Sequence, residues 1–335
     1  MKIYILFHRS FTPRYRVPQF IPYLRQRGIG ADLVRLSGNP FDRWRQFRRA
    51  GRYEVTVLQR RLLQPWDMAV LRHAARCLVF DFDDALMYRS SGRARPFSVS
   101  RMIKFRRTVG SCDMVFAGNS FLKKETERYV SPDRVHMIPT VVDMEQYTPK
   151  DHTETGDAVT IGWIGSRGTL RYLQTVMPAL DEVARRWDRV RLKVVCDAFP
   201  ERHQIPLVKK RWEETVEVDD VKSFDIGIMP LSDDLWTRGK CALKIVQYQA
   251  VGIPVVCSPV GANREIVTHG NNGLWATTHD EWVRQLSMLI ESPTLRKKMG
   301  MAGRKIITER YSVQAVGGRI VRLIKDLTAG MGTVQ

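Results

Sequence analysis

The sequence lacks several features that would define a class of protein. No stretch of its 335 residues approaches the roughly 18 consecutive apolar residues that a membrane-spanning helix needs. The apolar start from Lys2 to Phe7 is too short for the core of a signal peptide. The five cysteines are scattered and form no CxxC pair, which argues against a disulfide framework and a zinc site. We therefore expect a cytoplasmic protein with reduced thiols.

Negative charge is scarce in the first half of the chain. The whole sequence is 44% apolar and 27% charged, which is typical of a globular protein, and its length suits two domains. Residues 1–150 contain 28 Lys and Arg against 13 Asp and Glu, a net charge of +15. The remaining residues contain 26 against 22, a net charge of +4. Such an asymmetry favours an anionic partner for the first half.

Two basic stretches, residues 43–52 and 89–107, hold much of this charge. In the first, arginines interleave with Trp44 and Phe47 on a predicted helix. This pattern is typical of a surface that binds a polyanion, either phospholipid or nucleic acid. A solvated basic face without a partner is the alternative.

Short apolar segments alternate with helical ones in the first half. We predict strands at 2–8, 31–36, 54–58, 77–81, 114–117 and 135–138. We predict helices at about 17–27, 41–50, 66–74, 98–109 and 120–129. Alternating βα units indicate a parallel sheet that is covered on both faces.

A second α/β series follows a stretch without periodicity between Asp143 and Asp157. We place a linker at about 146–156, between an N-terminal domain, 1–145, and a C-terminal domain, 157–335. The second series has predicted strands near 159–165, 191–196, 215–218, 225–229, 254–258 and 273–276. Helices near 280–291, 294–308 and 312–327 end the chain, and the last is a candidate for packing back on the N-terminal domain.

Charged side chains cluster after the strand near 225–229, ahead of an apolar helix that begins at Leu243. They are Asp233, Asp234, Arg238, Lys240 and Lys244. Ligands of open α/β sheets bind beyond the carboxyl ends of the strands. Because Lys240 and Lys244 are four residues apart, we expect them on one helix face, where an anion such as a diphosphate would relieve their repulsion. Neutralisation by the two carboxylates is the alternative.

A second candidate for phosphate binding follows the strand at 159–165. Gly165 and Ser166 lie between this strand and a helix that begins at Leu170. Backbone N–H groups at such a helix start can bind phosphate. The loop matches neither GxGxxG nor a Walker motif, so a tight strand–helix turn without a ligand is the alternative.

Residues 247–265, QYQAVGIPVVCSPVGANRE, carry a specific resemblance. They resemble the C-terminal half of family 4 of the retaining glycosyltransferases, an α/β family of GT-B architecture with two Rossmann-like parallel-sheet domains that face a cleft. Further matching positions are Asn271–Leu274, Leu295, Met299, Gly300, Gly303, Arg304, Tyr311 and Ser312. In the first half, 81–85, 117–119 and 138–143 stand where the family has its cleft-facing strand ends and its hinge. The resemblance covers nearly the whole chain and is most specific over 225–273.

The resemblance implies transfer of a sugar from a UDP- or GDP-sugar, with retention and without a metal or other cofactor. The donor would bind to the C-terminal domain and the acceptor to the N-terminal domain. The implied donor-binding residues are Gly165, Ser166, Arg238, Lys240, Lys244 and Gln247. The cations among them would neutralise the diphosphate, and Gln247 stands where the family has a glutamate that binds the ribose.

The chain departs from the family at its Glu-x7-Glu pair, where Gly239 and Gln247 replace the two carboxylates. An amide can still bond to a ribose diol. The first carboxylate, which contacts the donor sugar in the family, has no counterpart unless Asp233 or Asp234 replaces it. A second hypothesis follows: a catalytically weak nucleotide-sugar-binding homologue that acts as a partner or scaffold.

Three carboxylates of the N-terminal half, Asp81, Asp83 and Asp84, follow a buried strand and are the candidate catalytic residues. We expect one of them to orient the acceptor hydroxyl or accept its proton. Others are expected to be structural, for instance as helix caps. A metal site is a weaker alternative, because no companion cluster is present in the sequence.

Arg14, Arg16 and Asn119 are expected on the acceptor side. With the basic N-terminal half, they favour a lipid-linked or cell-envelope glycan as acceptor, as in the synthesis of bacterial lipopolysaccharide or capsule. We therefore expect a peripheral protein on the inner face of the plasma membrane. Nucleic acid ranks last as a partner, because no RNP, helix-turn-helix or zinc-finger motif is present.

Overall fold

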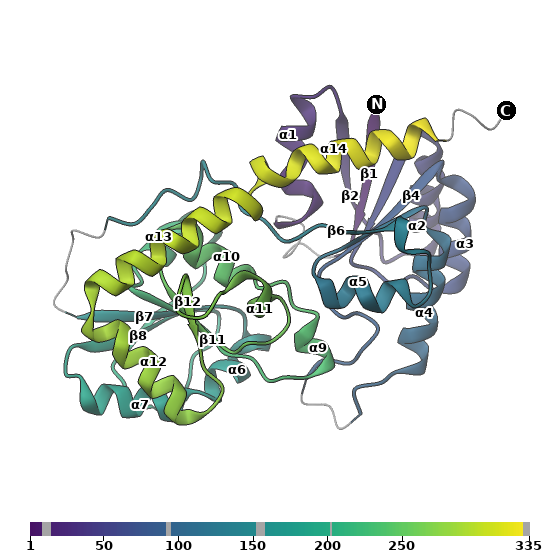
Figure 1. The fold of residues 1–335 in the computed structure, drawn as a ribbon. Coiled ribbons are helices and arrows are strands. Elements are labelled where there is room, and N and C mark those ends of the chain that lie inside the picture. Colours follow the sequence, from purple (N-terminus) through teal and green to yellow (C-terminus); the bar gives the residue numbers. More distant parts are fainter. Residues whose placement is uncertain (9–14, 92–94, 152–157, 202, 331–335) are drawn as a thin grey trace. The chain divides into compact units, whose positions relative to one another are not determined.

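The chain folds around two parallel β-sheets of six strands each, which are shown in Figure 1. The computed structural model describes residues 1–8, 15–91, 95–151, 158–201 and 203–330. Every strand pair in both sheets is parallel. This confirms the predicted α/β class with two Rossmann-like sheets.

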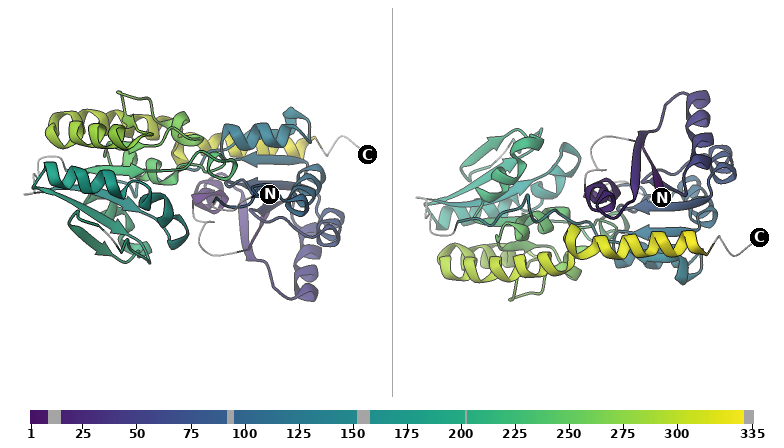
Figure 2. Two further views of the ribbon diagram at one scale, coloured as in Figure 1. Left: turned by 90° about the horizontal axis from the view of Figure 1, so that it is seen from below. Right: turned by 90° about the horizontal axis from the view of Figure 1, so that it is seen from above.

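The first sheet has the strand order β2-β1-β3-β4-β5-β6. Its strands are β1 (Lys2–Phe7), β2 (Gly30–Arg35), β3 (Val55–Gln59), β4 (Cys77–Phe82), β5 (Met114–Ala117) and β6 (Val135–Met137). One face is packed with α2 (Pro40–Arg48), α3 (Pro65–Ala74), α4 (Val99–Ser111) and α5 (Ser120–Glu127). The other face is packed with α1 (Ile21–Arg25) and α14 (Val313–Ala329). Figure 2 shows α14 running along this sheet.

The second sheet has the strand order β12-β11-β10-β7-β8-β9. Its strands are β7 (Val159–Ile164), β8 (Val190–Val195), β9 (Leu207–Lys210), β10 (Ile226–Met229), β11 (Val255–Cys257) and β12 (Gly273–Trp275). The helices that accompany it are α6 (Leu170–Gln174), α7 (Met177–Arg186), α8 (Glu217–Lys222), α10 (Leu243–Ala250), α11 (Ala262–Ile266), α12 (His279–Glu291) and α13 (Pro293–Arg310).

The chain crosses between two compact units more than once. The N-terminal unit comprises residues 1–141, 234–241 and the residues from Val313 onward. The C-terminal unit comprises residues 142–233 and 242–312. The short helix α9 (Leu235–Arg238) therefore packs with the first sheet, although it follows a strand of the second. Tyr147, in the stretch predicted as a linker, is buried in the core of the C-terminal unit.

Two local predictions were wrong. The strand expected at 215–218 is instead a short 3-10 turn, 214–216, followed by α8, and the strand of this region is β9. Glu217, Asp219 and Asp220 stand in the first turn of α8, where carboxylates favour a helix start. The helix expected at 17–27 is divided into a 3-10 turn, 17–20, and α1, and each segment has a proline near its start.

All five cysteines are buried and none forms a disulfide. None of the helices in the described part of the chain is long and apolar enough to cross a membrane.

Candidate functional site

Charged side chains meet at the carboxyl edge of the first sheet. The neighbouring strands β3, β4 and β5 end at Gln59, Phe82 and Ala117. The residues that follow are Arg60, Asp83, Asp84, Gly118 and Asn119. Since parallel strands place their carboxyl ends at one edge, residues from three separate parts of the sequence come together here.

Asp81, the first of the three predicted carboxylates, is fully buried and bound to Arg16. Nε of Arg16 lies 3.3 Å from one carboxylate oxygen, and its Nη2 donates to the other. Gln59 donates a third hydrogen bond at 3.3 Å, and Arg16 Nη1 donates to the Ile138 carbonyl at 2.7 Å. Burial lowers the pKa of Arg16, but the Asp81 carboxylate more than offsets this and raises the net pKa. Both groups are thus held as an internal ion pair.

Asp83 and Asp84 face Arg60 instead. Arg60 Nε lies 3.3 Å from Asp83 Oδ1, and its Nη2 donates to Asp84. The backbone of Arg60 has φ +49°, in the left-handed region that is strained for a residue with a side chain. Its N–H donates to the Asp81 carbonyl at 2.7 Å. Arg60 is thus fixed by its backbone and pairs with two of the predicted catalytic carboxylates.

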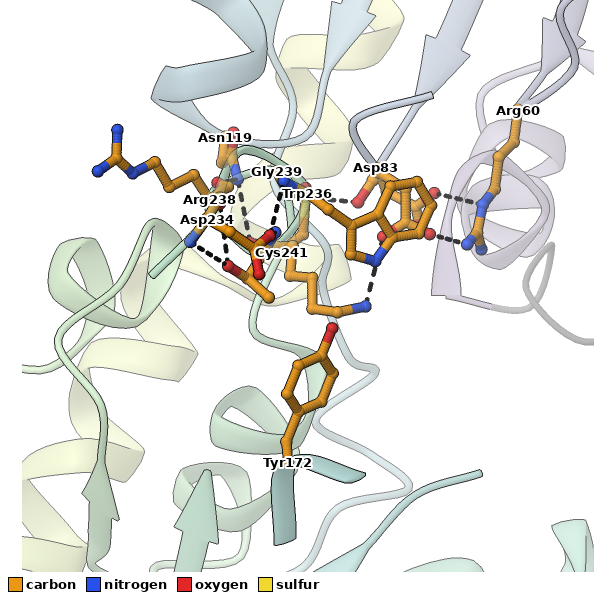
Figure 3. Close-up of polar contacts among 12 residues, drawn as sticks. Arg60, Asp83, Asn119, Tyr172, Asp234, Trp236, Arg238, Gly239 and Cys241 are labelled. Atoms are coloured by element: carbon orange, nitrogen blue, oxygen red, sulfur yellow. Dashed lines mark hydrogen bonds and ion pairs between the residues drawn. The ribbon is translucent and has the colours of Figure 1, made fainter. Parts of the chain in front are cut away.

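The segment 234–241 is seated on this edge, as Figure 3 shows. Asn119 Nδ2 donates to the carbonyls of Arg238 and Lys240, both at 3.0 Å. Its Oδ1 accepts from Leu122 N at 2.9 Å and so caps α5. Cys241 Sγ lies 3.3 Å from the Asp83 carbonyl. Asn119 therefore positions the backbone of segment 234–241, a role that the sequence, which suggested only an acceptor-side residue, did not predict.

Two glycines permit this close seating. A Cβ at Gly239 would lie 2.5 Å from Ala85 Cβ and 2.7 Å from its backbone nitrogen. A Cβ at Gly118 would lie 2.4 Å from Cys241 Sγ. Contacts this short leave no room for any other residue at Gly239, including a glutamate.

The structure separates Lys240 from Lys244, so the expectation that both project from one helix face is wrong. Lys240 precedes α10 and is divided from it by Ala242, whose φ of +52° breaks the helical run. Lys240 Nζ lies 3.7 Å from Asp84 Oδ1 and 5.6 Å from the centre of the Trp236 ring. Asp234, one of the carboxylates expected to neutralise it, caps α9 through Trp236 N and Thr237 N.

In the C-terminal unit, Lys244 lies in the first turn of α10. Its Nζ is 5.2 Å from the centre of the Trp163 ring, which belongs to β7. The face of an indole ring attracts a cation and so restrains the ammonium group. Lys244 is thereby held near the carboxyl end of β7, from which Gly165 and Ser166 follow.

The Gly165–Ser166 loop is a capped helix start. Ser166 and Thr169 form a capping box: Ser166 N donates to Thr169 Oγ1 at 3.1 Å, and the Ser166 side chain caps the third residue of the turn. Arg167 N donates to Asp197 at 2.8 Å. Ser166 and Arg167 are exposed, so their side chains are accessible to a ligand.

Gln247 is not at the surface of the C-terminal unit. Its side-chain amide donates to Glu217 Oε1 at 2.8 Å and to Tyr147 Oη at 3.0 Å, and the residue is 2% exposed. Tyr147 Oη and Trp212 Nε1 also donate to Glu217, at 3.2 and 2.7 Å. Burial of a carboxylate costs free energy, which these hydrogen bonds offset only when all of the donors are present.

The predicted residues thus form two groups. The N-terminal unit holds Arg16, Asp81, Asp83, Asp84, Asn119, Arg238 and Lys240, and the C-terminal unit holds Gly165, Ser166, Lys244 and Gln247. Arg14 lies outside the described residues. Sequence reasoning missed Arg60 and Glu217. Arg60 lies two residues after the strand predicted at 54–58, and this position was the available signal. The contact of Glu217 with Gln247 spans 30 residues and has no such signal.

Among the residues that the structure describes, no group of three or more His, Cys, Asp and Glu side chains could hold a metal ion.

Comparisons with known proteins find similarity between this chain and glycosyltransferases. Residues 158–292 match the family model "Glycosyl transferases group 1". A curated relative, the D-inositol 3-phosphate glycosyltransferase of Kribbella flavida, is 24% identical over 236 residues. That match covers 62% of this chain and 55% of the relative, so the chain matches about half of the relative's length.

Solved structures agree in fold along nearly the whole chain. Sucrose-phosphate synthase from Thermosynechococcus elongatus has a TM-score of 0.77 at 14% identity, and the match covers 98% of this chain and 99% of that one. HepE from Anabaena, solved in complex with UDP and glucose, has a TM-score of 0.71 at 15% identity, covering 97% and 99%. The chain therefore has the GT-B type of α/β fold. The family match over residues 158–292 and the curated relative support the predicted enzyme class, a glycosyltransferase.

Proposed function

We propose that this chain is a retaining glycosyltransferase of family 4. It moves a sugar from a UDP- or GDP-sugar to a hydroxyl group of a lipid-linked or cell-envelope glycan, and it needs no metal. The observation that carries this proposal is the match of residues 158–292 to the group 1 glycosyltransferases. That region contains the Gly165–Ser166 loop, Lys244 and Gln247.

The proposed donor site uses charge to stabilise the leaving diphosphate. Lys244 is restrained over an indole ring, so little side-chain freedom is lost when it binds an anion. The hydroxyl of the exposed Ser166 is proposed to donate a hydrogen bond to phosphate. Within the N-terminal unit, Arg238 and Lys240, on the segment that Asn119 holds, are proposed as further donor-binding cations. Charge-assisted contacts of this kind contribute about 1.5–3 kcal/mol each.

The proposed acceptor side is the carboxyl edge of the first sheet. Asp83 and Asp84 follow β4 and pair with Arg60. We propose that one of them orients the acceptor hydroxyl or accepts its proton. Asp81 is assigned a positioning role, because its oxygens are occupied by Arg16 and Gln59.

The experiment that tests the proposal measures transfer directly. The purified protein is incubated with labelled UDP- and GDP-sugars and a lipid-linked glycan pool, with chelator present. We expect release of nucleoside diphosphate together with a labelled glycan whose new linkage keeps the anomeric configuration of the donor. Absence of transfer with every donor and acceptor pool would contradict it.

A catalytically weak homologue that binds nucleotide sugars is the second candidate. It is favoured by the two positions that lack the family's carboxylates: Gly239 is packed against Ala85, and Gln247 is bound to Glu217. Donor binding without any turnover, in an assay where a known glycosyltransferase is active on the same pools, would favour this candidate over the first.

A further inference from the structure

The four most exposed of the large apolar side chains in the described part of the N-terminal unit lie at or next to the starts of three helices. Phe41, Trp66, Phe97 and Val99 are 75%, 58%, 62% and 77% exposed. Phe41 and Trp66 are the second residues of α2 and α3, Val99 opens α4, and Phe97 lies just before it. Side chains of this size are seldom left in water as a group unless they meet another surface.

The topology sets these helix starts at the carboxyl edge of the first sheet. Each of α2, α3 and α4 follows one strand and returns to the next parallel strand, so each begins where a strand ends. Trp44 Nε1 and Arg43 Nε donate to Asp67 at 2.9 and 3.1 Å, which joins the first turns of α2 and α3. Figures 1 and 2 show α2, α3 and α4 in one layer.

The aromatic residues that the sequence suggested for this surface point elsewhere. Phe47 is buried in the core under the helical layer, and Trp44 packs against that core. Phe41 and Trp66 take the outward positions instead. Phe97 is held by an edge contact with Tyr88, with ring centres 5.6 Å apart, so its exposed ring is preorganised.

Positive charge is concentrated in the sequence on both sides of Phe97 and Val99. Residues 85–112 contain no Asp or Glu and seven Arg and Lys: Arg89, Arg93, Arg95, Arg101, Lys104, Arg106 and Arg107. Within the described part of this stretch, Arg89, Arg95 and Arg101 are exposed. Large apolar side chains among unbalanced cations are the features of a protein face that enters the headgroup region of an anionic bilayer.

We infer that the starts of α2, α3 and α4 form a membrane-docking surface for an anionic phospholipid bilayer. Trp66, Phe97 and Val99 enter the interfacial layer, and Arg89 and Arg95 contact lipid phosphates. The surface lies at the same edge of the sheet as Asp83 and Asp84. It rests on the proposed function in one respect: it brings a lipid-linked acceptor to that edge.

Binding to vesicles of phosphatidylcholine, with and without phosphatidylglycerol, tests the inference in the absence of any nucleotide sugar. We expect the wild type to sediment with the anionic vesicles only, and F97S/V99S to lower the partition coefficient roughly tenfold. The matched control M288S/M301S removes two exposed apolar side chains of the C-terminal unit and should bind like the wild type. Melting temperatures identify any variant that is misfolded, and Trp66→Ser then replaces it.

The position of the charge is tested separately. R89Q/R95Q should lose more vesicle affinity than R48Q/R49Q, which removes equal charge at the far end of α2. The inference would be overturned if F97S/V99S bound vesicles as well as the wild type, or if both arginine pairs lost equal affinity. Binding of duplex DNA is measured for the same arginine variants. If R89Q/R95Q lost affinity for DNA but not for vesicles, the inference would also be overturned. A wild type that binds vesicles without transferring sugar would instead contradict the proposed function alone.

Discussion

Gly239 lies against Ala85, so that a Cβ built on the glycine would be 2.5 Å from the alanine Cβ. In the glycosyltransferases that this chain resembles, a carboxylate is expected at this position. The packing explains its absence: the turn after α9 is seated on the residues that follow β4, and a side chain would push it off. The departure from the family pattern is thus part of the fold.

Gly239→Ala should therefore destabilise the protein, by about 1–3 kcal/mol, because the added methyl group overlaps backbone atoms as well as a side chain. Gly239→Glu should be worse and should not raise activity. Thermal denaturation measures both. Gly110→Ala is the control: nothing lies within 4 Å of its Cβ, and alanine favours the helix. An unchanged melting temperature for Gly239→Ala would contradict the contact.

Gln247→Glu should also fail to restore a family-type donor site. In the wild type, the Gln247 amide donates to Glu217 at 2.8 Å. The new carboxylate would therefore lie beside that of Glu217. Two buried carboxylates repel, so we expect the free energy of unfolding to fall by about 2 kcal/mol or more. The swap E217Q/Q247E keeps one carboxylate and one amide and should recover most of the stability. Urea denaturation measures the stabilities, and a Gln247→Glu variant as stable as the wild type would show that the two side chains do not touch.

Asp81 and Asp84 should respond differently to removal of charge. Asp81→Asn leaves the buried Arg16 guanidinium without its counter-ion, so we expect a stability loss of about 3–5 kcal/mol. Asp84→Asn should cost less, about 1–2 kcal/mol, because its partner Arg60 is partly exposed to water. Chemical denaturation gives the stabilities. Transfer rates measured on the folded protein should fall for Asp84→Asn. If Asp84→Asn lost more stability than Asp81→Asn, the positioning role of Asp81 would be refuted.

Lys244→Ala should weaken donor binding and leave the fold intact. Loss of one charge-assisted contact to the diphosphate predicts an increase in Kd of about 10–100-fold. Lys298→Ala, at an exposed position of α13, is the control and should bind the donor normally. Calorimetric titration of nucleoside diphosphate measures both. If Kd is unchanged in Lys244→Ala, this lysine does not belong to the donor site.

Much of the fold was predictable because apolar segments alternate with helical ones at regular intervals. The strands that end at Phe82 and Ala117 were read within one residue, and this located the edge at which Asp83, Asp84 and Asn119 meet. The predictions failed at the helix near the N-terminus, which prolines divide into two segments, and at the start of α8. In the first case two prolines interrupt an apolar pattern that is otherwise helical. In the second, carboxylates that favour a helix start lie in and just after a segment that was predicted as a strand.

The contacts of the candidate site were less predictable, because they join residues that are distant in sequence. Spacing suggested a shared helix face for Lys240 and Lys244, but the left-handed Ala242 separates them. Gln247 was expected at the ribose, and only its distant partner Glu217 reveals that it is buried. Likewise, the period of α2 alone does not reveal that Phe47 packs inward while Phe41 is exposed.

The most direct test of the central claim is a calorimetric titration of the wild-type protein with UDP and GDP, in the presence of a chelator. We predict saturable binding of one of the two, weakened in Lys244→Ala and retained in Lys298→Ala. If neither nucleotide binds, the chain has no diphosphate donor site at Lys244 and the proposed glycosyltransferase function is contradicted.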